Sequence, residues 1–188
     1  MNLSNIFLFL VVATVTNADS SQVTQITAKT FSKELSSSSK YMIKFYADWC
    51  GHCKRLAPTW EEVASELAET YDKDGVKVGK VEGSTERAVS SRFAITGFPT
   101  IYFVDGWNVR KYKGSRTKED LLQFARGGYK NVEPDSFVTS PFGPLGYAKG
   151  VLMDIGIVML DVYQFFVDKG VPPVIVGITM CIGGMVGR

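Results

Sequence analysis

Residues 44–54 read Lys-Phe-Tyr-Ala-Asp-Trp-Cys-Gly-His-Cys-Lys. The aromatic run that opens this stretch has strand character, and two cysteines, three positions apart, follow where a helix is expected to begin. Unpaired backbone N–H groups at a helix N-terminus stabilise a thiolate, so we expect the pKa of Cys50 to be lowered. His52, the only histidine in the chain, would add to this stabilisation when charged. A redox-active pair of cysteines is therefore predicted.

Two other uses of the cysteine pair have to be weighed. A zinc site needs about four ligands, and the chain has no second cysteine pair, because the third cysteine, Cys181, lies in the apolar C-terminal part. A purely structural disulfide between Cys50 and Cys53 would close so short a loop that it would remove little chain entropy. Redox chemistry is favoured over both alternatives, and no metal or cofactor is expected.

Short apolar runs alternate with helical stretches on both sides of the pair, which predicts an α/β fold with parallel strands and crossover helices. The strands are expected at residues 23–26, 41–46, 76–81, 100–104 and 108–112. A first helix is expected from Cys50, with a kink at Pro58 and a buried stripe at Leu56, Trp60, Val63 and Leu67. A second helix is expected from Thr85 to Phe93, capped by Ser84. A third is expected from Thr117 to Phe124, with Asp120 completing a capping box. Because Asp105-Gly106 suits a tight hairpin turn, the sheet is predicted to be mixed.

The N-terminal segment is typical of a signal peptide. Residues 1–18 contain the apolar run Ile6 to Val12, which is followed by small residues suited to cleavage. No Lys or Arg precedes this run, and a buried N-terminal strand is the alternative interpretation.

The composition changes near residue 130, where the predicted globular domain, residues 22–130, ends. Residues 131–147 show no sustained period and are interpreted as a linker. In residues 148–170, the acidic residues Asp154, Asp161 and Asp168 recur every seven positions on one edge of an apolar stretch. This pattern indicates an amphipathic juxtamembrane helix with a solvated acidic face, or a stripe that meets a partner within the membrane.

Residues 171–188 are interpreted as a transmembrane helix. The 17 residues from Val171 to Gly187 carry no charge, which is the lower limit for crossing a hydrocarbon layer of roughly 30 Å. The sequence then stops, so that either the cytosolic tail is negligible or the chain is cut within or just after the span. A buried apolar helix is the alternative, and Cys181 is interpreted as an apolar filler.

The stretch 44–54, taken with Gly97-Phe98-Pro99-Thr100, resembles the thioredoxin-fold domains of the protein disulfide isomerase superfamily from about Val23 to Gly128. With a signal peptide and a single span added, the chain is similar to the thioredoxin-related transmembrane proteins of the endoplasmic reticulum. The resemblance implies a thioredoxin fold in which Cys50 is the nucleophile, Cys53 resolves mixed disulfides and Pro99 is a cis proline beside them. The substrate-binding surface would then consist of Trp49, Gly51, Phe98 and Pro99.

One position departs from this family pattern. The residue six positions before the first cysteine is usually a buried Asp or Glu that takes a proton from the second cysteine, and here it is Lys44. Burial would lower the pKa of Lys44, so that its neutral amine could accept a proton, whereas its charged form would favour both thiolates. We therefore expect altered resolution by Cys53, unless Lys44 reaches solvent and has no role.

Two further charges are expected to act on the cysteines. Gly114-Ser115-Arg116 resembles the loop whose arginine approaches the second cysteine in isomerases, so Arg116 would lower the pKa of Cys53; a solvated surface charge is the alternative. Asp48 stands where isomerases often carry proline, and its negative charge should partly oppose the stabilisation of the Cys50 thiolate.

These features predict a membrane-anchored thiol-disulfide oxidoreductase or isomerase that acts on cysteines of secretory-pathway proteins. It would be a single-pass type I protein of the endoplasmic reticulum membrane, with its catalytic domain in the lumen. Its expected partners are cysteine-containing clients, an upstream redox partner and the lipid bilayer. The net charge of +2, with Lys and Arg dispersed along the chain, gives no support for nucleic-acid binding. The alternative function is a membrane-tethered client-binding or chaperone module with little turnover.

Overall fold

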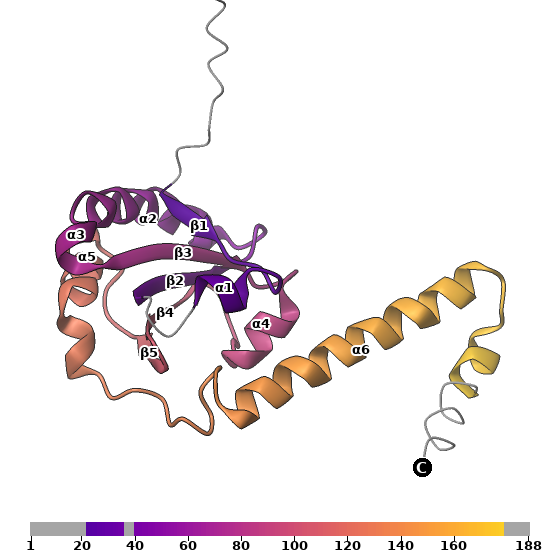
Figure 1. The fold of residues 1–188 in the computed structure, drawn as a ribbon. Coiled ribbons are helices and arrows are strands. Elements are labelled where there is room, and N and C mark those ends of the chain that lie inside the picture. Colours follow the sequence, from indigo (N-terminus) through magenta and orange to yellow (C-terminus); the bar gives the residue numbers. More distant parts are fainter. Residues whose placement is uncertain (1–21, 36–39, 179–188) are drawn as a thin grey trace, which may run out of the picture.

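The computed structural model describes residues 22–35 and 40–178. The predicted signal peptide lies outside these residues, as do Cys181 and the second half of the predicted transmembrane helix. Those interpretations stay predictions. The described part consists of an α/β domain and a long helix that projects from it (Figure 1).

A five-stranded sheet lies at the centre of the domain, with its strands in the order β1-β3-β2-β4-β5 (Figure 1). Strands β1, β3 and β2 run parallel, whereas β4 pairs antiparallel with β2 and β5 pairs antiparallel with β4. The strands are β1 (Val23–Gln25), β2 (Lys40–Tyr46), β3 (Val76–Glu82), β4 (Thr100–Asp105) and β5 (Asn108–Tyr112). The predicted mixed sheet is confirmed, and Gly106 takes the positive φ, 60°, in the hairpin turn.

Helices cover both faces of the sheet. The helices of the described residues up to Asp168 are α1 (Phe31–Glu34), α2 (Gly51–Glu69), α3 (Tyr71–Asp74), α4 (Arg87–Arg92), α5 (Lys118–Arg126), the 3-10 helix η1 (Gly128–Asn131) and α6 (Pro144–Asp168), of which α6 does not lie on the sheet. The buried stripe predicted for α2 is confirmed, and α2 continues through Pro58. Helix α5 has the predicted cap, in which the Thr117 hydroxyl oxygen accepts a hydrogen bond from the Asp120 N–H.

Three of the helices before α5 differ from the prediction. Helices α1 and α3 were not expected, because a helix of four residues carries no repeated apolar period. The helix predicted from Thr85 begins only at Arg87, and Ser84 does not cap it. The Ser84 hydroxyl donates instead to the carboxylate of Glu82 at 2.6 Å, which holds these residues in a turn before the helix.

Two hydrophobic cores fill the spaces between the sheet and its helices. Strand β2 contributes to both, because its side chains alternate between the two faces. Met42 packs with Trp60 and the α2–α5 side, whereas Ile43 packs with Phe31 and the α1–α4 side. Since Met42 and Ile43 are both 0% exposed, the central strand is enclosed on both faces.

The segment predicted as a linker, residues 131–147, contacts the domain at particular points, although its side chains from 131 to 139 are exposed. The Asp135 N–H donates to the carbonyl of Val109 on the edge strand at 2.8 Å, and the Phe142 ring stacks on Phe31 with centroids 5.6 Å apart. Helix α6 also begins before the predicted residue 148, at Pro144, where proline suits the first turn. These contacts extend the domain beyond residue 130. They are long-range, so the sequence of this segment has no local apolar period from which they could be predicted.

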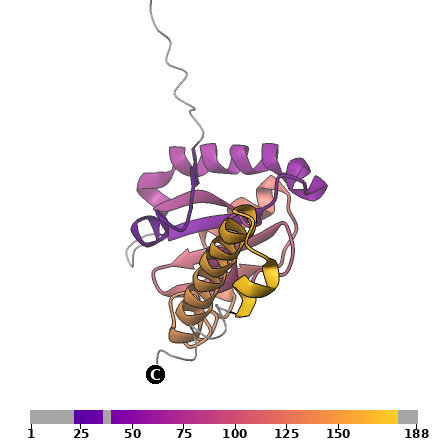
Figure 2. The same cartoon turned by 90° about the vertical axis from the view of Figure 1, so that its right-hand side faces the viewer.

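By length and composition alone, α6 is the one helix in the described part of the chain that could cross a membrane. It projects beyond the domain (Figure 1) and therefore lies in front of the domain in the view of Figure 2. Most of its apolar side chains are exposed. After α6, Gly170 turns the chain with a φ of 86°, and residues 173–178 are helical again. The helix predicted to be amphipathic is thus apolar enough to be a span itself, while the predicted span is described only in part.

We predict that Phe103→Ala lowers the free energy of unfolding by about 3–5 kcal/mol. Phe103 is 0% exposed and stacks on Tyr129, with ring centroids 4.1 Å apart, so its removal leaves a cavity. Chemical denaturation followed by circular dichroism measures the change. Phe137→Ala is the matched control, because Phe137 is 61% exposed and its loss should cost less than about 0.5 kcal/mol. Equal losses in the two variants would contradict the described packing.

Candidate redox site

Cys50 and Cys53 lie where the central strand passes into the first long helix. Strand β2 ends at Tyr46, a short loop follows, and Cys50 is the extended N-cap residue of α2, with φ −80° and ψ 111°. Both cysteines are free thiols and are buried, 7% and 4% exposed. Across the described residues, no three His, Cys, Asp or Glu side chains gather in a way that could hold a metal ion.

The pKa values of the two thiols move in opposite directions. The hydrogen bond from the Cys53 thiol lowers the pKa of Cys50, and the backbone N–H groups of Cys53 and His52 and the charge of Arg55 add to this effect against burial. Burial raises the pKa of Cys53 to about 11, and its hydrogen bond to Cys50 acts in the same direction. Cys50 is therefore the thiol that can become a nucleophile near neutral pH, while Cys53 keeps its proton.

Lys44 lies behind Cys53 on the side of β2 that faces α2. It is 4% exposed, and its Nζ atom lies 5.4 Å from the centroid of the Trp60 ring. Lys44 and Cys53 line one cavity of about 270 Å³, together with Glu61 from α2 and Lys80 from β3. The interpretation that Lys44 simply extends into solvent does not fit this burial.

The cavity brings the pKa of Lys44 down toward neutral pH. Burial lowers the pKa of Lys44 to about 8; the negative charge of Glu61 opposes the shift and the positive charge of Lys80 adds to it. Lys80 Nζ and Glu61 Oε1 are themselves 3.8 Å apart. Both forms of the Lys44 amine are therefore populated under physiological conditions, and the charged form lowers the pKa of Cys53.

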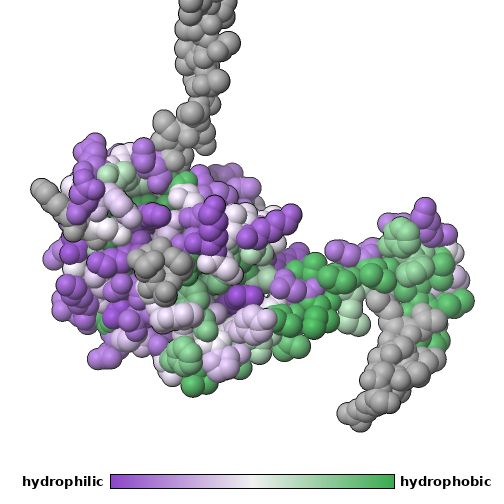
Figure 3. Space-filling view, in the orientation of Figure 1, coloured by the Kyte–Doolittle hydropathy of each residue, from purple (hydrophilic) through white to green (hydrophobic). Residues whose placement is uncertain are grey.

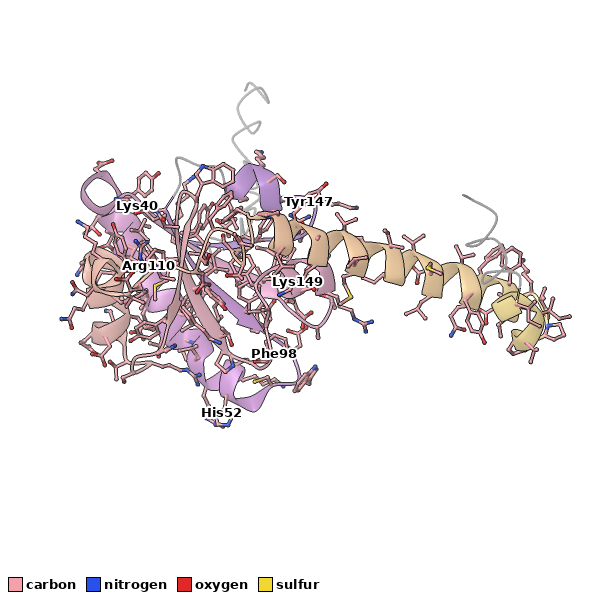
Figure 4. The ribbon with its side chains drawn as sticks, turned by 90° about the horizontal axis from the view of Figure 1, so that it is seen from below. Lys40, His52, Phe98, Arg110, Tyr147 and Lys149 are labelled. Atoms are coloured by element: carbon pink, nitrogen blue, oxygen red, sulfur yellow. The ribbon has the colours of Figure 1, made fainter. Side chains whose placement is uncertain are left out.

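Phe98 and Pro99 form a ledge beside Cys50, on the same edge of the domain as His52 (Figure 4). The Phe98-Pro99 peptide bond is cis, as the family resemblance led us to expect. The Cys50 thiol donates to the Phe98 carbonyl, with a sulfur–oxygen distance of 3.6 Å. Trp49, 73% exposed, meets the Phe98 ring edge-on at 6.1 Å between centroids. Gly83 leaves room for Phe98, because a Cβ atom there would lie 2.4 Å from the ring.

Two predicted residues make contacts other than those expected. The exposed His52 ring accepts a hydrogen bond at Nδ1 from Arg55 Nη2 at 2.7 Å, and His52 contributes to the lowered pKa of Cys50 through its backbone N–H, which adds to the larger effect of the Cys53 thiol. Arg116 donates to the Pro99 carbonyl at 3.1 Å, so it braces the ledge, whereas we expected it to approach Cys53. Side-chain direction, which depends on tertiary contacts, accounts for both differences.

Two carboxylates near the site escaped the sequence reasoning. Glu82, 8% exposed, accepts hydrogen bonds at 2.6 Å from the Ser84 hydroxyl and the Thr85 N–H. Burial alone would raise the pKa of Glu82, but these bonds and one from the backbone of Asp48 outweigh it and hold the pKa low. Glu82 thereby ties the loop before Cys50 to the end of β3. The other carboxylate, Glu61, follows Cys53 by two helical turns on one side of α2, a spacing that could have identified it.

Comparison with known proteins supports the geometry. The family described as Thioredoxin matches residues 22–127. Over 85 residues, 45% of this chain and 18% of the relative, the chain is 41% identical to protein disulfide-isomerase TMX3 of Xenopus laevis. Over 138 residues, 71% of this chain and 47% of the relative, it is 36% identical to thioredoxin-related transmembrane protein 1 of Bos taurus. The chain thus spans from about a fifth to about half of the length of these relatives.

Solved structures have the same fold. The J-Trx1 fragment of ERdj5 aligns with a TM-score of 0.52 and 27% identity over 60% of this chain and 54% of that chain. The first thioredoxin domain of mouse protein disulfide-isomerase A4 aligns with a TM-score of 0.50 and 29% identity over 64% of this chain and 78% of that chain. The thioredoxin fold predicted from the sequence is confirmed.

We predict that iodoacetamide alkylates Cys50 at neutral pH and leaves Cys53 unmodified. Alkylation follows the thiolate fraction, which is increased at Cys50 by its lowered pKa and negligible at Cys53, whose pKa is about 11. Fragmentation mass spectrometry of the peptide that contains both residues locates the label across a pH series. Labelling of both sites at the same rate and pH would refute the assignment of roles.

Proposed function

The chain belongs to the thioredoxin family, and we propose that it is a membrane-anchored thiol-disulfide oxidoreductase or isomerase that acts on cysteines of secretory-pathway proteins. The observation that carries this proposal is the Cys50 thiol at the N-cap of α2, with its lowered pKa and with Cys53 behind it. The names of the relatives, protein disulfide-isomerase and thioredoxin-related transmembrane protein, support both the chemistry and the anchor.

In the oxidising direction, a client thiolate attacks the Cys50 sulfur of the Cys50–Cys53 disulfide. The S–S bond breaks, its electron pair leaves with the Cys53 sulfur, which takes up a proton, and the client becomes joined to Cys50. A second client thiolate then attacks the client sulfur of this mixed disulfide and displaces the Cys50 thiolate. The client loses two electrons and the cysteine pair gains them. The low pKa of Cys50 makes it a good leaving group in the last step.

In isomerisation, the reduced Cys50 attacks a client disulfide first, and Cys53 frees Cys50 when the mixed disulfide stalls. Cys53 must lose its proton to do so, because the thiolate is the attacking form. The neutral amine of Lys44, which lines the same cavity, takes this proton and becomes an ammonium ion beside the new thiolate. Lys44 thus does the work of the carboxylate found at this position in related proteins, with a group whose pKa of about 8 is set by burial.

The ledge supplies the client-binding surface in this proposal. An extended client segment would lie along Phe98 and Pro99, and Arg116 holds the Pro99 carbonyl in place. The exposed Trp49 and Gly51 would flank the segment on the side of the cysteines. Such a surface could also hold clients without turnover, which keeps a binding or chaperone module as the second candidate function.

The proposed setting is the lumen of the endoplasmic reticulum, with the chain as a single-pass type I membrane protein. The apolar run within residues 1–18 supports targeting, and the uncharged stretch from Val171 to Gly187 supports a span. Clients and an upstream redox partner would meet the cysteine pair there.

We predict that Cys50→Ala abolishes insulin reduction, and that Cys53→Ala still attacks but accumulates mixed disulfides. Turnover is measured by insulin precipitation, and adducts by non-reducing electrophoresis. Cys181→Ala is the control, because Cys181 is remote in sequence from the reactive pair, and its turnover should match that of the native chain. An active Cys50→Ala protein would overturn the proposal. The binding module is the function if two results are found together. The native chain would reduce insulin no faster than the variant with both Cys50→Ala and Cys53→Ala, and the two proteins would suppress client aggregation equally well.

We predict that release of a Cys50–glutathione mixed disulfide accelerates as the pH rises through about 8. Below that pH Lys44 is charged and cannot accept the Cys53 proton; above it the neutral amine can. In Lys44→Met this rise with pH disappears, and release above about pH 8 slows by about 100-fold, the usual scale for a lost general base. In Lys44→Glu the step moves to lower pH, since a carboxylate accepts a proton in more acidic solution. Quenched-flow measurement of free glutathione gives each profile.

The cavity offers two matched controls for this experiment. Lys80→Met removes a charge that lowers the pKa of Lys44, so the step should move to higher pH. Glu61→Gln removes a charge that raises it, so the step should move to lower pH. Superimposable profiles for the native chain and Lys44→Met would remove Lys44 from the mechanism.

A further inference from the structure

Helix α6 is fixed to the domain by its first two turns. Gly146 and Gly150 are buried there, and a Cβ atom at Gly150 would lie 2.3 Å from Arg92 Nε, so glycine lets α6 approach α4 closely. The Arg92 guanidinium lies over the rings of Phe31 and Tyr147, 5.3 Å from each centroid. Figure 4 shows Tyr147 at this junction, where α6 leaves the domain. Packing therefore sets which side of α6 faces the domain.

The side of α6 that contacts the domain continues along the helix as its acidic side. At roughly 100° per residue, an α-helix places these positions within an arc of about 80°. They are Gly146, Gly150, Asp154, Ile157, Asp161, Gln164 and Asp168, so that Ile157 is the one apolar side chain among them. All three carboxylates of α6 thus point to the side on which the domain lies.

The opposite side of α6 is apolar along its whole free length. Its side chains are between 40% and 67% exposed, and Figure 3 shows the hydrophobic surface that runs along the helix. They are Leu152, Ile155, Met159, Val162 and Phe166. An acidic edge beside a continuous apolar face allows a helix to lie along a membrane interface, although α6 is also apolar enough in composition to cross a membrane.

Two other arrangements fit these features less well. If α6 crossed the bilayer, Asp161 would lie deep in the hydrocarbon layer with Asp154 and Asp168 on either side, where ionised carboxylates are strongly disfavoured. If α6 packed on a second copy of itself, a narrower apolar seam would suffice. The chain also turns at Gly170, directly before the uncharged stretch that begins at Val171, which suits a change from the interface to a span.

We propose that α6 lies in the plane of a lipid bilayer, with its apolar side among the lipid chains and its acidic side toward water and the domain. This inference rests on the membrane anchor of the proposed function and adds an orientation to it. The domain, held through Gly150 and Arg92, then sits on the water side of the helix at a fixed distance from the lipid.

Depth measurements on the full chain in phosphatidylcholine vesicles test the orientation. Single cysteines are placed at Ile157 and Gln164, on the domain side, and at Met159 and Phe166, on the apolar side, with the native cysteines replaced by serine. Each carries an environment-sensitive fluorophore, and lipids with quenchers at known depths are added. We expect labels at 159 and 166 to share one depth within the lipid and labels at 157 and 164 to stay in water.

Each alternative has its own result. A spanning helix would give 157 and 159 one depth and 164 and 166 another, whichever side they are on, and this would overturn the proposal. Labels that respond to protein concentration and not to quenching lipids would overturn it in favour of helix pairing. Insulin reduction by the native chain in the same vesicles tests the proposed oxidoreductase function separately. If the native chain reduces insulin but all four labels are found in water, only the proposed orientation of α6 is overturned.

Discussion

Strand β2 is enclosed on both faces, and this constraint decides the character of the site. The five central residues of β2 are buried between the two helical layers, so Lys44 has to be accommodated inside the domain, 4% exposed. The same strand ends in the loop that leads to Cys50, so the helix that covers Lys44 also presents the thiols. Strand burial thus connects the unusual amine to the conventional cysteine pair.

The two thiols differ in acidity because they occupy different positions at one helix start. Cys50 precedes the first turn and receives hydrogen bonds, whereas Cys53 lies within that turn and faces the interior. A single hydrogen bond between them lowers one pKa and raises the other. The inner thiol is the one that needs help to ionise, and the cavity beside it, lined by Lys44, Glu61 and Lys80, is where the proposed mechanism places proton transfer.

The elements that repeat an apolar pattern could be predicted from the sequence, whereas elements without such a repeat were missed. The stripe of α2 and the alternation of β2 repeat often enough to be recognised, whereas α1 and α3 make one turn each. Cys50 and Cys53 could be placed because the start of a helix positions them, whereas the place of Pro99 beside them was implied only by the family resemblance. Arg116 could not be placed, because its partner, the Pro99 carbonyl, is selected by the folding of a distant loop. The packing of Phe142 on Phe31 is likewise a contact between segments with no common pattern.

Phe142 also bears on where the domain ends. Its ring lies on Phe31 and meets Trp107 edge-on at 5.7 Å, and α6 follows directly with its glycines against α4. The family match ends at residue 127, before any of these contacts. A soluble fragment cut at that boundary would lose the cover over Phe31 and Arg92 and expose an apolar patch that promotes aggregation. Solution behaviour measured on such a fragment would describe a surface that the whole chain never presents.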